Sequence, residues 1–88
     1  MIKKEITIEN KHGLHARPAA LLVKAAGKFK ADFFISKDGY EVNGKSIMGV
    51  MTLAAEPGSV VLLTFDGADE QEALQAIEGL IKNKFFED

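Results

Sequence analysis

Two short segments of this chain hold side chains that could take part in chemistry. In the first, residues 13–19, His15 and Arg17 stand directly before a run of residues that favour helix. Backbone N–H groups at a helix start, together with the helix dipole, favour a bound anion. Pro18 suits the first turn because it lacks only an N–H that would have no partner inside the helix. The segment predicts a phosphate site.

His15 is the candidate nucleophile of this site. A neutral imidazole has a ring nitrogen whose lone pair can accept a phosphoryl group. Arg17 would hold the phosphoryl oxygens through charge-assisted hydrogen bonds. A surface histidine in a capping loop, beside an arginine that only faces water, explains the same two residues. Their spacing alone leaves both interpretations open.

Other chemistries find less support in the sequence. His12 and His15 have the spacing of a metal pair, but we expect them on opposite sides of a helix start, and the chain has no cysteine. The Gly-x-Ser-x-Gly pattern of a serine hydrolase does not occur. We therefore expect no metal site and no cofactor.

The second segment is residues 45–51. Ser46 is expected to act as the N-cap of a short helix from Ile47 to about Leu53, although no capping-box Glu follows it. Ile47, Val50 and Met51 form one apolar stripe, which we expect to face the core. Met48 lies to the side and, with Leu21, would leave an exposed apolar patch suited to docking. A phosphate on Ser46 would place negative charge beside that patch.

The rest of the sequence predicts the elements that position these segments. We expect strands at residues 2–8, 33–37, 40–43 and 59–65, and helices at residues 15–26, 47–53 and from 69 onward. Asp38-Gly39 predicts a type I′ hairpin turn, and Asp69 with Glu72 resembles a capping box. The buried faces of the first and last helices are expected at Ala19, Leu22, Val23, Ala26, Ala73, Ile77, Leu80, Ile81 and Phe85 or Phe86.

This order, βαββαβα, predicts an α+β fold. We expect an open-faced β-sandwich, in which three helices cover one face of a four-stranded antiparallel sheet and the other face is wet. Residues 1–88 would form a single domain, since 47% apolar and 27% charged residues are typical of a small globular domain.

The net charge of -2 argues against direct nucleic-acid binding. The sequence shows no signal peptide and no membrane-spanning run, so we expect a cytoplasmic protein that does not insert into membranes.

The two segments together resemble those of HPr, the histidine-containing phosphocarrier family of the bacterial phosphoenolpyruvate-dependent sugar phosphotransferase system. The match extends over essentially the whole chain. It implies that His15 accepts phosphate through Nδ1 from enzyme I and passes it to sugar-specific IIA domains, while Arg17 steadies the phosphoryl group. Such a protein is a carrier in a relay and not a self-sufficient catalyst. His12 departs from the family pattern, which more often has Asn, Ser or Thr there.

The resemblance also implies regulation and partners. Ser46 matches the serine that HPr kinase/phosphorylase phosphorylates, which slows the His15 reaction and promotes binding to a catabolite-control repressor. A monomer is expected. The docking face implied for enzyme I and the IIA domains consists of Ala16, Ala20, Leu21, Lys24, Ile47, Met48 and Met51. The alternatives are a nitrogen-branch or other regulatory phosphocarrier, or a Ser46-dependent corepressor module.

Overall fold

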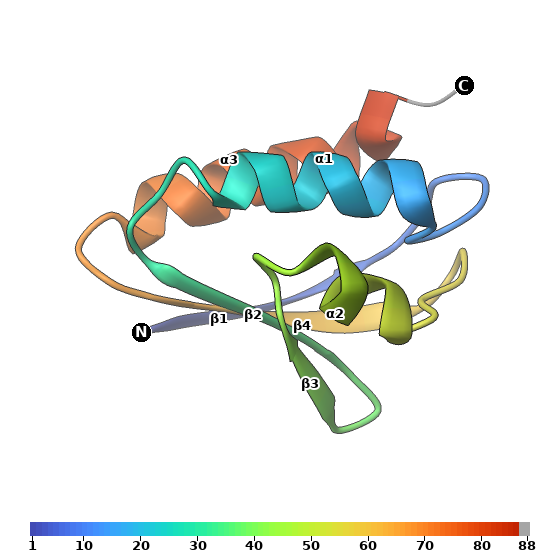
Figure 1. The fold of residues 1–88 in the computed structure, drawn as a ribbon, viewed down its shortest axis with the longest axis horizontal. Coiled ribbons are helices and arrows are strands. Elements are labelled where there is room, and N and C mark those ends of the chain that lie inside the picture. Colours follow the sequence, from blue (N-terminus) through green and yellow to red (C-terminus); the bar gives the residue numbers. More distant parts are fainter. Residues whose placement is uncertain (87–88) are drawn as a thin grey trace.

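Four strands and three α-helices, in the predicted order, make up residues 1–86, which the computed structural model describes. The elements are β1 (Ile2–Thr7), α1 (Ala16–Ala26), β2 (Asp32–Lys37), β3 (Tyr40–Asn43), α2 (Ile47–Thr52), β4 (Val60–Asp66), α3 (Glu70–Lys82) and a short 3-10 turn, η1 (Lys84–Phe86). The helices lie on one side of the sheet (Figure 1). The predicted open-faced α+β sandwich is confirmed.

The strands form one antiparallel sheet in the order β1-β4-β2-β3. The inner strands are β4 and β2, and Phe65 of β4 stacks on Phe33 of β2 with ring centroids 4.7 Å apart. At the β2–β3 turn, Asp38 and Gly39 adopt φ values of 53° and 82°. These positive values belong to the predicted type I′ turn.

The two long helices, α1 and α3, lie side by side over the sheet, and α2 packs beside α1 near β3 (Figure 1). Most of the predicted helical core residues are buried, while Val23 and Leu80 are half-buried. After α3 the chain turns through left-handed φ values at residues 84–86. This turn places Phe85 in the core and leaves Phe86 75% exposed.

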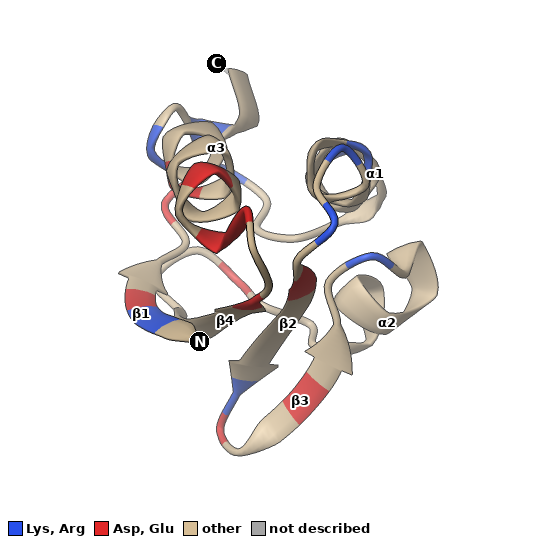
Figure 2. Ribbon diagram, turned by 90° about the vertical axis from the view of Figure 1, so that its left-hand side faces the viewer, with Lys and Arg blue, Asp and Glu red and all other residues tan. Residues whose placement is uncertain are grey.

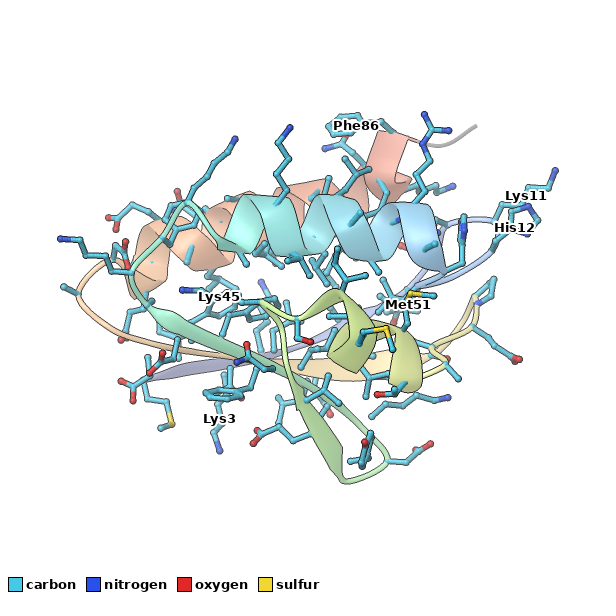
Figure 3. All side chains as sticks on the ribbon, in the orientation of Figure 1. Lys3, Lys11, His12, Lys45, Met51 and Phe86 are labelled. Atoms are coloured by element: carbon cyan, nitrogen blue, oxygen red, sulfur yellow. The ribbon has the colours of Figure 1, made fainter. Side chains whose placement is uncertain are left out.

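One charged residue interrupts the inward-facing side of β1. Lys4 shares that side with Ile2 and Ile6, and its Nζ pairs with the Glu78 carboxylate of α3. The hydrogen bond from Lys4 lowers the pKa of Glu78 against the opposing effect of burial. Lys3 extends from the opposite side of the sheet (Figure 3). An ion pair between strand and helix therefore accounts for the break in the alternation.

The predicted capping box at the start of α3 is wrong. Asp69 occupies the capping position, but its side chain makes no capping hydrogen bond. Its two carboxylate oxygens instead accept hydrogen bonds from the Lys30 and Ala31 amides, at 2.8 Å and 2.7 Å. These bonds, that from Lys30 above all, lower the pKa of Asp69 against the opposing effect of burial. The Asp69 carboxylate therefore makes two hydrogen bonds to the segment before β2 in place of a hydrogen bond to the first turn of its own helix.

Candidate functional site

His15 caps the first helix. Its backbone is extended (φ -82°, ψ -172°), and its carbonyl oxygen accepts the first helical hydrogen bond, from the Ala19 amide at 2.9 Å. The residue is half-buried. The imidazole therefore stands at the positive end of the helix dipole, where the sequence predicted it.

The start of α1 suits a bound anion. The N–H groups of a first turn point out of the helix, and Ala16 and Arg17 supply them here, since Pro18 has none. No acidic residue lies in this turn, and within residues 1–86 no side-chain hydrogen bond caps it. Arg17 is exposed, so its guanidinium is accessible to an anion held beside His15.

The loop before α1 is tied to the loop between α2 and β4. The Leu14 amide donates to the Ala55 carbonyl oxygen at 2.9 Å. Asn10 is fully buried, and its Nδ2 donates to the Gly13 carbonyl oxygen at 2.7 Å. Gly13 has φ +67°, and a Cβ there would overlap the Ala55 oxygen, so the position requires glycine. These contacts fix the backbone that carries His15.

A shallow pocket of about 240 Å³ lies beside His15. Its lining consists of His12, Leu14, His15, Met51, Ala54, Ala55 and Glu56. The rings of His12 and His15 meet edge to face, with centroids 5.6 Å apart and planes at 87°. The expectation that these histidines lie on opposite sides of the helix start is therefore wrong. The left-handed backbone of Gly13 turns the loop back and brings the two rings together.

Three parts of this environment had no signal in the sequence. Asn10 sits in a polar loop, where burial is not expected. Glu56 and Ala54 reach the site only because their loop is tied to the loop before α1, and Ala54 takes a left-handed φ of 50° to do so. In the described part of the chain, no group of three or more His, Cys, Asp or Glu side chains is placed to hold a metal ion.

Comparison with known proteins decides the family. A family model described as the PTS HPr component phosphorylation site matches residues 2–83. This chain belongs to the HPr family. Phosphocarrier protein HPr of Xylella fastidiosa is 50% identical over 88 residues, which are 100% of this chain and 99% of the relative.

Two further relatives sharpen this placement. The HPr-like protein Crh of Halalkalibacterium halodurans is 48% identical over 84 residues, which are 96% of this chain and 100% of the relative. Among solved structures, HPr-C-His from Thermoanaerobacter tengcongensis superposes with a TM-score of 0.96 at 50% identity, covering 100% of this chain and 99% of that one. The HPr family explains the joint occurrence of both segments.

The predicted docking face is accessible, and its α2 part is broader than expected. Ile47 and Met51 were predicted to face the core, but they are 43% and 40% exposed, and Met48 is 75% exposed. Of the predicted α2 stripe only Val50 is buried, because a six-residue helix turns just one side to the sheet. The α1 residues Ala16, Ala20, Leu21 and Lys24 are likewise exposed or half-buried.

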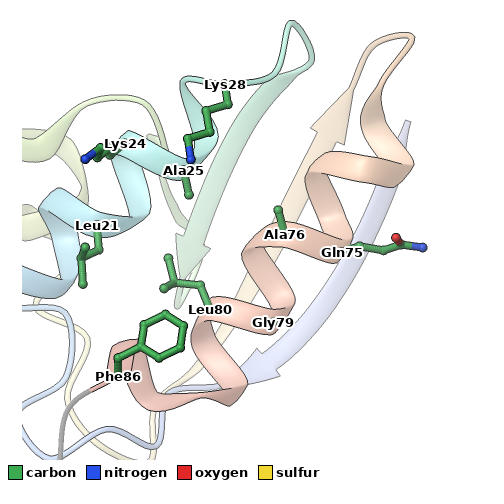
Figure 4. A pocket seen from close by; sticks show the side chains of 9 residues that line it. All are labelled: Leu21, Lys24, Ala25, Lys28, Gln75, Ala76, Gly79, Leu80 and Phe86. Carbon is green, nitrogen blue, oxygen red and sulfur yellow. The ribbon is translucent and has the colours of Figure 1, made fainter.

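A larger hollow of about 490 Å³ lies between α1 and α3 (Figure 4). Leu21 and Lys24 line its α1 side, so it borders the docking face, and Phe86 and Leu80 line its far side. A Cβ at Gly79 would meet nothing within 4 Å, so this wall is open. His15 does not line this hollow.

Charge differs between the two long helices (Figure 2). The charged residues of α1 are Arg17 and Lys24, both basic, whereas the first turn of α3 carries Glu70 and Glu72. A partner that docks on α1 therefore meets apolar groups bordered by positive charge. Within residues 1–86, no helix is long and apolar enough to cross a membrane.

Proposed function

We propose that this chain carries a phosphoryl group on His15 within the phosphotransferase system, receiving it from enzyme I and delivering it to IIA domains. The observation that carries the proposal is the start of α1. There a half-buried imidazole stands at a helix end that has outward-pointing amides, an accessible arginine and no acid in its first turn. Membership of the HPr family supports the same function.

The transfer is a displacement at phosphorus. The lone pair of a His15 ring nitrogen forms the new P–N bond while the P–N bond to the donor histidine breaks and returns its electron pair to that nitrogen. The Ala16 and Arg17 amides and the Arg17 guanidinium stabilise the charge on the three phosphoryl oxygens. The reverse events on a IIA domain release the group, so the chain ends each cycle unchanged.

The shallow site explains why this chain acts as a carrier. A pocket of about 240 Å³ at the surface holds the phosphoryl group without enclosing it, so a partner can approach in line. The docking face beside it offers exposed Met48 and basic α1 residues to an acidic, apolar surface. A monomer leaves this face free for each transfer, and we expect the transfer to need no metal or cofactor held by this chain.

The test is phosphorylation with phosphoenolpyruvate and a catalytic amount of enzyme I, followed by intact mass and acid lability. Wild type should gain one acid-labile phosphoryl group and His15→Ala none. The matched control is His12→Ala, which removes the other of the two histidines and should still gain one. Acceptance by His15→Ala, or by no form while a known carrier is phosphorylated, would contradict the proposal.

The same phosphorylated protein can be used to distinguish a sugar branch from a nitrogen or other regulatory branch, by testing which IIA domains accept its phosphoryl group. Transfer to IIA domains of sugar permeases supports the proposed role. Transfer confined to a nitrogen-branch IIA domain would assign the chain to regulation instead.

Ser46 is proposed as the regulatory phosphorylation site. Its Oγ accepts a hydrogen bond from the Gly49 amide at 3.1 Å, and Ile47 and Met48 follow it on the exposed side of α2. A phosphate there adds negative charge to the docking face and repels the acidic partner that this face fits. The same phosphate would create the surface that a catabolite-control repressor recognises.

Incubation with ATP and an HPr kinase/phosphorylase tests this role. Wild type should gain an acid-stable phosphate and Ser46→Ala none. Ser46→Asp should slow His15 phosphorylation by enzyme I roughly tenfold, while Ser46→Asn, which adds no charge, should not. Equal rates for the Asp and Asn variants would contradict the electrostatic explanation. A chain that accepts phosphate on Ser46 but never on His15 would be a corepressor module.

A further inference from the structure

His12 occupies one wall of the His15 pocket and belongs to the loop that precedes α1 (Figure 3). Its ring meets the His15 ring edge to face at a centroid distance of 5.6 Å. Unlike His15, it is exposed. A phosphoryl group attached to a His15 ring nitrogen on the pocket side would therefore lie beside the His12 ring.

The charges around His12 determine what its own charge would do. The other titratable side chains of the pocket wall are His15, at the start of α1, and Glu56, on the loop between α2 and β4. Lys11 is its exposed neighbour in the chain, and Arg17 is exposed on the first turn of α1. Glu56 brings a negative charge to the pocket that receives the phosphoryl group, so a positive charge on His12 would offset it.

We propose that His12 is a phosphoryl-binding residue of this carrier: its imidazole donates a hydrogen bond to the phosphoryl group on His15 and, when protonated, holds that group more strongly. This inference rests on the proposed phosphorylation of His15. No bond to His12 forms or breaks. Proton binding to His12 and phosphoryl binding to His15 then favour each other, because each lowers the free energy of the other.

The consequence is a pH-dependent carrier. An imidazole changes its charge within the physiological pH range, whereas arginine and lysine keep theirs. His12 adds a second imidazole to this pocket, beside that of His15 itself. Compared with a variant that lacks the His12 imidazole, wild type should therefore hold the phosphoryl group more strongly at lower pH.

A competition experiment isolates this effect from the pH dependence of the donor. Wild type and His12→Gln are mixed with one catalytic pool of enzyme I and limiting phosphoenolpyruvate, brought to equilibrium, and resolved by intact mass. Because both proteins exchange with the same donor, the ratio of their phosphorylated fractions reports only their relative hold on the phosphoryl group. Glutamine keeps a hydrogen-bond donor without the charge.

We expect wild type to hold the phosphoryl group about threefold to tenfold more strongly than His12→Gln at about pH 6, with the ratio approaching one at about pH 8.5. His12→Ala, which also loses the donor, should remain weaker than wild type at both pH values. The matched control Lys11→Gln removes a neighbouring charge that is not in the pocket, and its ratio should not change with pH.

Each other outcome is decisive. A His12→Gln ratio that is the same at both pH values would overturn the inference, and so would a change of equal size in Lys11→Gln. Failure of the proposed function is different, because neither wild type nor variant would then be phosphorylated at all. Circular dichroism of the three variants excludes loss of fold as the cause of a lowered ratio.

Discussion

The two long helices of this protein begin in opposite ways. At the start of α3, the Asp69 carboxylate accepts hydrogen bonds from the Lys30 and Ala31 amides and ties the helix to the segment before β2. At the start of α1, the capping residue is His15, and the first turn holds no acid. Both helices bury an apolar side against the same sheet. They differ in the residues that occupy their first turns.

The difference shows what each end is for. A carboxylate at a helix start satisfies the local positive potential from within the chain, and the end becomes structural. Where the chain supplies a histidine and an arginine instead, that potential stays available to an anion from outside. The start of α2 is intermediate, because the neutral Ser46 hydroxyl satisfies one amide and carries no charge.

The largest expected effect comes from placing a carboxylate in the first turn of α1, as α3 has in its own first turn. In Ala16→Glu, a carboxylate at the first helical position would compete with the phosphoryl group for the same amides and repel it. The fraction phosphorylated at equilibrium with enzyme I should fall at least about tenfold. Helix stability should hold or rise by about 0.3–1 kcal/mol, since the charge suits the dipole.

Two controls separate the site from the docking face. Ala16→Gln changes size without charge and should leave the equilibrium near that of wild type. Ala20→Glu adds the same charge one turn further along the docking face, so it should slow the transfer but not shift its equilibrium. If Ala20→Glu lowered the equilibrium as much as Ala16→Glu, the open end of α1 would have no special role.

The second experiment removes the charge of Asp69 beside the start of α3. Asp69→Asn should lower the stability measured by urea unfolding at neutral pH, because two amides lose a charged acceptor. The pKa of Asp69 is lowered in the folded protein, so its contribution is present above about pH 4 and is lost as the pH falls through the lowered pKa. The gap between wild type and variant should therefore close in acid; a constant gap would assign the effect to packing.

A smaller loss of stability is expected at the start of α2. Ser46→Ala removes the acceptor of the Gly49 amide and should cost about 1 kcal/mol in urea unfolding. Ser46→Asp keeps an acceptor and should recover most of that stability, although it impairs docking. A Ser46→Ala variant as stable as wild type would show that the cap is dispensable.

Much of the fold could be predicted because its signals are local. The alternation in β1, the Asp38-Gly39 turn and the apolar run of β4 each specify their element within a few residues. The position of His15 at a helix start follows from the same kind of signal. These features depend on backbone geometry that the sequence displays directly.

The predictions failed where distant segments meet. Asp69 was assigned to its own helix, but its partners lie 38 and 39 positions away. Met51 was assigned to the core by periodicity, which does not show how little of a short helix the sheet can cover. The contact of His12 with His15 depends on the positive φ of Gly13, which in turn depends on the close approach of Ala55.

The smallest effect concerns Glu70, the first residue of α3. Glu70 accepts a hydrogen bond from the Gly67 amide at 3.1 Å, the main cause of its lowered pKa, and pairs with the Met1 ammonium at 3.2 Å. Glu70→Gln keeps an acceptor for the amide, so it should lower the thermal midpoint less than Asp69→Asn does. Salt screens the ion pair but hardly touches the hydrogen bond. If raising the salt concentration leaves the difference in thermal midpoint between Glu70→Gln and wild type unchanged, the ion pair with Met1 contributes nothing to stability. The start of α3 would then be stabilised by hydrogen bonds from amides alone.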